Sequence, residues 1–163
     1  MKTAHLSAET VVTAPAETVW TILADCRMDV HWRAGVLSMR HEPPGPLHVG
    51  SRTIELLELL GRRLETTARV TELEPQRLMR WVAEEGADVA GERRVEPLPD
   101  GAQRVRLELR FRPRGLVQTL LAPIMIARIR ANLRADVRRF ATLAEAIPAA
   151  PRSAASPRDA ARA

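Results

Sequence analysis

The most constraining feature of the sequence is a run of strand-like stretches that ends in one long helical pattern. Six such stretches cover residues 36–41, 49–60, 64–73, 78–83, 89–95 and 105–111. Short turns separate them, which is typical of an antiparallel meander. A sheet with one apolar face needs an element that covers this face, so we expect the meander to pack against the long helix.

The helical pattern near the C-terminal end is the only one long enough to cover a sheet. Its apolar residues recur at three- and four-residue steps, which defines one face of an amphipathic helix. They are Ile126, Ile129, Leu133, Val137, Phe140 and Ala144. Pro123 is expected either to begin the main segment of this helix or to kink it.

One strand and two helices are expected before the meander. The strand covers residues 5–13, and the first helix covers residues 14–24. Pro15 suits the first turn of that helix, and Thr13 is a possible cap. A second short helix is expected over residues 25–32. The predicted order is therefore strand, two helices, six strands and one long helix.

The chain carries an excess of positive charge, which could attract nucleic acid or anionic lipid. The net charge is +5, and nearly all of the basic residues are arginines. Single-strand binders need aromatic platforms, but the chain has only three Trp and two Phe and no Tyr. We therefore expect no nucleic-acid partner and interpret the charge as background composition. Five helix arginines are expected to face solvent, with weak contact to an anionic membrane as the alternative. They are Arg128, Arg130, Arg134, Arg138 and Arg139.

Cysteine usage and apolar patterning suggest a cytoplasmic location. Cys26 is the only cysteine, so no intrachain disulfide can form. The first ten residues lack the apolar segment of a secretory signal. The longest apolar stretch, 116–129, is interrupted by Gln118, Thr119 and Arg128. It is too short and too polar to be expected to span a bilayer.

Several stretches resemble a known superfamily. They are TAPAETVWTILAD at residues 13–25, HWRAGV at 31–36 and VTELEPQRLMRWV at 70–82. Together with the terminal helix, they are similar to the START-like (SRPBCC, helix-grip) superfamily, in particular its bacterial polyketide cyclase/dehydrase-like branch. The resemblance covers about residues 4–147 and depends on the whole pattern, because no single motif is diagnostic.

The resemblance implies an α+β helix-grip fold. A curved seven-stranded antiparallel sheet would wrap around the long C-terminal helix, with two short helices after the first strand, and enclose a ligand cavity. We expect this domain to cover residues 1–147. Residues 148–163 are rich in Ala, Pro, Ser and Arg without periodicity, and are expected to form a disordered tail.

The first hairpin register predicts which side chains face the cavity. If Gly61 and Arg62 form a two-residue turn, Leu59 pairs with Leu64, Leu57 with Thr66, and Glu55 with Ala68. Paired residues share a face, and this face is clearly the apolar one. Glu55 is therefore expected to point inward, unless a β-bulge turns it outward.

The second hairpin gives a similar prediction for one arginine. A three-residue loop at 99–101, with Gly101 in the left-handed conformation, pairs Val95 with Val105 and Arg93 with Leu107. Arg93 is therefore expected to point inward as well. Two inward charges are costly unless they are paired or solvated, so Glu55 and Arg93 are expected to depend on each other directly, through water or through a ligand.

Twelve residues are candidates for contact with the ligand. They are Glu55, Arg93, Trp81, Met79, Leu57, Thr66, His31, Trp32, Leu107, Phe111, Ile126 and Ile129. For two of them a structural role is favoured, with Trp32 packed between helix and sheet and His31 on the surface. The spacing of the histidines suggests no metal site, and no phosphate-binding or dinucleotide-binding motif is present, so neither a metal nor a cofactor is expected.

Three functions are compatible with this sequence. The first is a carrier or binding protein for a small apolar molecule such as a lipid, quinone or polyketide. The second is a polyketide cyclase, aromatase or dehydratase that acts in the same cavity, although the absence of Tyr weakens this hypothesis. The third is a module that docks on a membrane or a protein partner through its basic helix.

Overall fold

The structure is a computed structural model that describes residues 3–59, 61–85 and 88–147. The tail predicted over 148–163 lies outside the described residues. The elements are β1 (Ala4–Val12), α1 (Ala16–Ala24), η1 (Cys26–Met28), α2 (Asp29–Trp32), β2 (Val36–Glu42), β3 (Arg52–Leu59), β4 (Arg62–Glu74), β5 (Leu78–Ala83), β6 (Asp88–Pro97), β7 (Gln103–Arg112) and α3 (Gly115–Ala146). The predicted element order and α+β fold class are confirmed.

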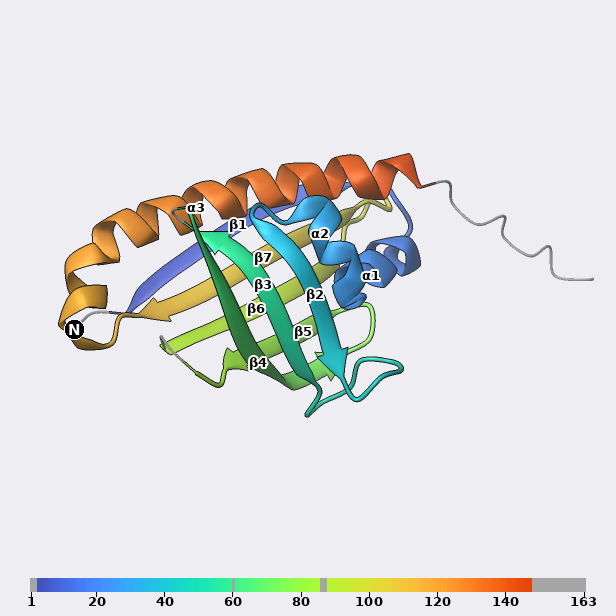
Figure 1. The fold of residues 1–163 in the computed structure, drawn as a ribbon. Coiled ribbons are helices and arrows are strands. Elements are labelled where there is room, and N and C mark those ends of the chain that lie inside the picture. Colours follow the sequence, from blue (N-terminus) through green and yellow to red (C-terminus); the bar gives the residue numbers. More distant parts are fainter. Residues whose placement is uncertain (1–2, 60, 86–87, 148–163) are drawn as a thin grey trace, which may run out of the picture.

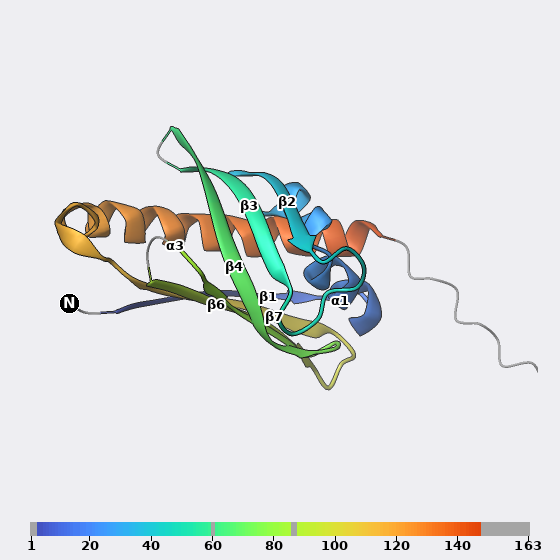
Figure 2. The same ribbon diagram turned by 60° about the horizontal axis from the view of Figure 1, so that its bottom comes forward.

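The seven strands form one antiparallel sheet in the order β1-β7-β6-β5-β4-β3-β2. The first strand therefore pairs with the last, and every other neighbour follows in chain order. The sheet curls around α3, with β1 and β7 on one side of the helix and β2, β3 and β4 on the other (Figures 1 and 2). This arrangement is the predicted helix grip.

The core gathers around the C-terminal half of α3. Leu133, Val137, Phe140 and Ala144 are buried there, at the spacing that the sequence indicated. Trp32 packs edge-on against Phe140, with ring centroids 5.2 Å apart and planes at 83°. The helix as a whole packs mainly along β1. Its C-terminal half therefore anchors the sheet, whereas the N-terminal half of α3 is left free to cover a cavity.

The second predicted hairpin register is confirmed. Val95 pairs with Val105 and Arg93 with Leu107. The amide of Leu98 donates to the carbonyl of Ala102, which leaves a three-residue loop with Gly101 at φ 86°.

The first predicted register is wrong by two residues. Leu59 pairs with Arg62, Leu57 with Leu64, and Glu55 with Thr66. Gly61, with φ 73°, lies directly before the paired Arg62. Because side chains alternate with a period of two, this displacement leaves the same residues on the concave face.

Three helix boundaries also differ from the prediction. Pro15 is the N-cap of α1, and the Thr13 hydroxyl contacts the Glu145 carboxylate (3.3 Å) instead of capping the helix. The short helix predicted over 25–32 is divided into η1 and α2, because the Asp25 side chain caps a separate turn by accepting a hydrogen bond from the Arg27 amide. Pro123 lies within α3, which begins two turns earlier at Gly115.

Candidate ligand-binding cavity

A cavity of about 510 Å³ lies between the concave face of the sheet and α3. Its walls come from β2 to β7, with Arg33 and Ala34 just before β2, on one side and from the helix on the other. Most of the lining is apolar, and the apolar lining residues include Leu57, Val70, Met79, Trp81, Phe111 and Ile129. Leu64 and Thr66, near the tip of the β3–β4 hairpin, line the cavity and are also exposed to solvent. The cavity therefore opens between this hairpin and α3.

The structure places eight of the twelve candidate residues in the cavity wall. They are Glu55, Leu57, Thr66, Met79, Trp81, Arg93, Phe111 and Ile129. The other four lie elsewhere. His31 is exposed on α2, Trp32 and Leu107 are buried in the core, and Ile126 packs partly buried against that core.

A buried ion pair closes one end of the cavity. The Arg93 guanidinium donates to both carboxylate oxygens of Asp29, one of them at 2.9 Å, and to the carbonyl of Leu23 at 2.7 Å. Asp29 is fully buried and Arg93 is 5% exposed. The guanidinium carbon also lies 5.2 Å from the centroid of the Trp32 ring. The inward Arg93 is therefore paired, but its partner is Asp29 and not Glu55.

Arg33 connects this pair to Glu55. Its Nη1 lies 3.1 Å from Asp29 Oδ2 and 2.7 Å from Glu55 Oε1. Burial disfavours the charge on Arg33, but the carboxylates of Glu55 and Asp29 outweigh it and raise the pKa of the guanidinium. The two inward charges that the sequence predicted therefore meet through a chain of four side chains, in the order Glu55, Arg33, Asp29 and Arg93.

A third carboxylate, Asp136, reaches the same end of the cavity from α3. Its Oδ1 accepts a hydrogen bond from the amide of Ala34 at 2.6 Å. Burial raises the pKa of Asp136 to about 6, and the Ala34 amide and the Arg33 charge oppose this shift. Asp136 is therefore poised to hold or release a proton near neutral pH at the cavity wall.

The sequence-based search missed Asp29, Arg33 and Asp136, although signals were present. Asp29 and Arg33 are four residues apart, the spacing at which helix side chains pair. Asp136 is a charge that falls among Leu133, Val137 and Phe140 on the apolar face of the helix. A charge on a core face is more informative than a charge on a solvent face, because it needs a partner.

The Trp81 ring packs against Gly91 on the neighbouring strand. The two residues pair across β5 and β6. A Cβ atom added to Gly91 would overlap the Trp81 ring, at separations that real contacts do not reach. The missing side chain therefore determines where the indole lies and how much of the cavity it fills.

The ionisation of Asp136 is expected to destabilise the fold as the pH rises. Its pKa is raised from 3.8 to about 6, so the protonated form favours folding and this contribution is lost between about pH 4 and pH 6. One pKa unit corresponds to about 1.4 kcal/mol. Between about pH 4 and pH 7, the free energy of unfolding of the wild type should therefore fall by about 2 kcal/mol relative to Asp136→Asn. Urea unfolding of both proteins at several pH values measures this difference. Parallel pH profiles of the free energy of unfolding would show that Asp136 ionises normally.

Comparison with known proteins identifies a family and several solved structures that are similar to this chain. The family described as polyketide cyclase / dehydrase and lipid transport matches residues 3–145. No curated protein shows a significant match to the sequence. Among solved structures, the Zhui aromatase/cyclase from Streptomyces sp. R1128 has a TM-score of 0.76 at 21% identity, covering 88% of this chain and 94% of that one.

Two further solved structures share the fold. A protein from Thermus thermophilus has a TM-score of 0.72 at 16% identity, covering 86% of this chain and 97% of that one. A START superfamily protein from Mycobacterium smegmatis has a TM-score of 0.60 at 16% identity, covering 85% of this chain and 98% of that one. At these identities the likeness concerns the fold alone. Since the family match spans nearly the whole described domain, the chain belongs to the polyketide cyclase / dehydrase and lipid transport family.

Proposed function

We propose that the protein binds a small hydrophobic molecule with one polar group in its internal cavity. The observation that supports this most directly is an apolar cavity of about 510 Å³ that ends in a buried network of ionisable side chains. Cavities of this size hold lipid-, quinone- or polyketide-sized ligands, and a few placed polar groups orient them.

The composition of the network favours a neutral polar group on the ligand. Three carboxylates (Asp29, Glu55 and Asp136) face two guanidinium groups (Arg33 and Arg93), and the arginines are already engaged. An anionic head group would have to displace a carboxylate from an arginine or lie unpaired beside it, which is costly in a buried site. A carbonyl or hydroxyl group needs only hydrogen bonds, and Asp136 can supply or accept one.

Trp81 is expected to report ligand binding. Titration with dodecanol should change the tryptophan emission of the wild type, and Trp81→Phe should remove most of this change. Trp20→Phe is the matched control, because Trp20 packs against the main core. Dodecanoate at about pH 8 should bind at least about tenfold more weakly than dodecanol, because its charge is added to the carboxylates. Native mass spectrometry of the protein from its own host would identify the retained molecule.

Gly91→Ala provides a second variant for the same measurement. The added methyl should push the indole into the cavity and weaken binding of the longest ligands first. If neither apolar ligand binds the wild type and the cavity proves to be filled, the proposed function fails.

A second candidate function is catalysis on a polyketide-like molecule, as a cyclase, aromatase or dehydratase. Asp136 supports it, because general acid–base catalysis works best when the pKa of the group lies near the working pH. Under this hypothesis Asp136→Asn or Glu55→Gln should abolish turnover and leave binding nearly unchanged. Equal losses in binding and turnover would instead indicate that these carboxylates only orient the ligand.

A further inference from the structure

The first turns of α3 expose an apolar stripe. Leu116 is 85% exposed, Leu120 78% and Val117 71%. Leu121 and Ile124 extend the stripe by another turn, and both are also exposed. The spacing places these five side chains on one side of the helix. Single exposed leucines need no explanation, but a continuous exposed stripe of this kind marks an interaction surface.

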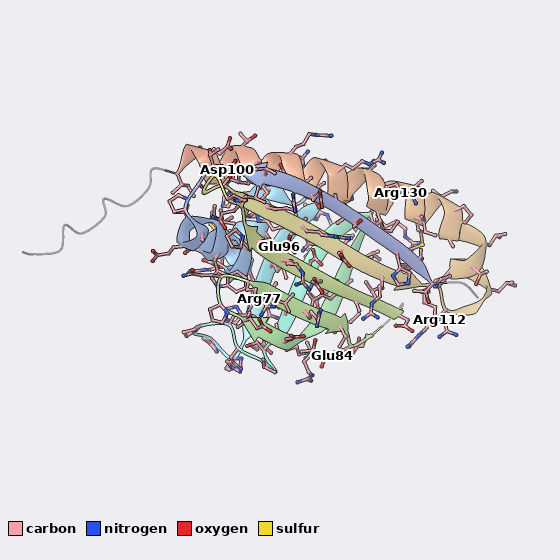
Figure 3. The ribbon with its side chains drawn as sticks, turned by 180° about the vertical axis from the view of Figure 1, so that it is seen from behind. Arg77, Glu84, Glu96, Asp100, Arg112 and Arg130 are labelled. Atoms are coloured by element: carbon pink, nitrogen blue, oxygen red, sulfur yellow. The ribbon has the colours of Figure 1, made fainter. Side chains whose placement is uncertain are left out.

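Arginines precede and follow this stripe along the chain. Residues 109–135 contain six arginines and no acidic residue. Arg110, Arg112 and Arg114 are exposed just before the stripe, and Figure 3 shows Arg112 at the end of β7, beside the start of α3. After the stripe, the exposed side of α3 becomes basic, and Figure 3 shows Arg130 directed outward from the helix. The stripe is thus flanked along the chain by exposed arginines on both sides, of which Arg114 lies 4.0 Å from the carboxylate of Asp88.

The stripe lies beside the opening of the cavity. Gln118, Met125 and Ile129, on the other side of the same helical segment, line the cavity. The facing rim is the β3–β4 hairpin, which rises beside α3 in Figure 2 and carries exposed Arg62 and Arg63 next to Leu64. A surface that received the stripe would therefore also lie against the cavity opening.

We propose that this stripe docks on the surface of an anionic lipid bilayer. The leucines enter the boundary between head groups and acyl chains, and the flanking arginines contact anionic head groups. Among the described residues, α3 is the one helix that is long and apolar enough to cross a membrane, and its most apolar 18 residues are only 6% buried. Its C-terminal half is occupied by the core, so the helix lies on the membrane and does not cross it.

The charge pattern favours a bilayer over a second copy of the chain. Two copies that pair through the stripe would bring their arginines together without acidic residues from residues 109–135 to neutralise them. An anionic bilayer supplies both the apolar layer and the opposite charge. The consequence for function rests on the cavity binding its ligand, as proposed above: docking lets an apolar ligand pass between bilayer and cavity without crossing water.

Sedimentation with vesicles tests the docking. The wild type should associate with phosphatidylcholine vesicles that contain about one third phosphatidylglycerol, and much less with phosphatidylcholine alone or at high ionic strength. Leu116→Ser with Leu120→Ser should weaken the association at least about tenfold, because both side chains lose their transfer into the bilayer. Val49→Ser is the matched control, since Val49 is also exposed but lies in the β2–β3 loop.

The outcomes separate docking from ligand binding, because dodecanol binding is measured on the same samples. Vesicle association without dodecanol binding would support the docking and overturn the proposed function. Dodecanol binding without vesicle association would overturn the docking, as would equal association of the wild type and the serine variant. A dimer or a complex with an acidic protein that the serine variant abolishes, without vesicle association, would also overturn it and identify the stripe as a protein interface.

Discussion

Arg93→Met is expected to lower the free energy of unfolding by about 3–5 kcal/mol, because it leaves a buried carboxylate without its partner. Asp29 is fully buried, and its other charged contact, Arg33, is shared with Glu55. Urea unfolding measures the loss. Arg94→Met is the matched control, because Arg94 lies on the adjacent position of the same strand with a partly exposed side chain paired with Glu92. It should cost less than about 1 kcal/mol.

The same experiment tests the connection to Glu55. If Arg33 and Asp29 link the two inward charges, Glu55→Gln and Arg93→Met should be non-additive by at least about 0.5 kcal/mol. Adding Asp29→Asn to Arg93→Met should recover part of the lost stability, because it removes the unpaired charge. Strict additivity of Glu55→Gln and Arg93→Met would show that the pair of Glu55 with Arg33 acts independently of the pair of Asp29 with Arg93.

Truncation of the chain after Ile126 is expected to abolish cooperative unfolding. The cut removes Leu133, Val137 and Phe140 from the core and exposes the concave face of the sheet. Loss of one buried Phe side chain already costs about 3–5 kcal/mol, so removing the entire segment exceeds the stability of an ordinary domain. Circular dichroism and thermal melting measure the result.

Truncation after Ile147 is the control, because every core residue described above stays in place. It should leave the melting temperature nearly unchanged, in accordance with the domain boundary proposed from the sequence. A cooperative unfolding transition in the protein truncated after Ile126 would contradict the role assigned to the C-terminal half of α3.

The sheet could be predicted because strand alternation and turn residues are read from neighbouring positions in the sequence. Alternation in β7 and the left-handed Gly101 were sufficient for the correct pairing of Arg93 with Leu107. The other hairpin shows the limit of this argument. Glycine predicts a turn, but the sequence does not specify which turn position Gly61 occupies, so the register was displaced by two residues.

The polar network was harder to predict because its contacts are non-local. Arg93 and Asp29 are 64 residues apart, and Asp136 meets the amide of Ala34 across 102 residues. Hairpin geometry shows that Arg93 points inward, but it does not specify which carboxylate lies opposite. The volume of the cavity likewise depends on how tightly the sheet curls, which no residue pattern defines.

The C-terminal half of α3 packs into the core, whereas its N-terminal half covers the cavity. The two halves are therefore expected to differ in local stability. The turns that contain Phe140 and Ala144 open only when the whole domain unfolds, because their side chains belong to the core. The turns from Leu116 to Ile124 contribute few buried side chains and so open at a much smaller free energy. We therefore expect amide hydrogen exchange to divide this single helix into a slow segment at its C-terminal end and a fast segment at its N-terminal end, so that the wall of the cavity can open locally while the fold remains intact.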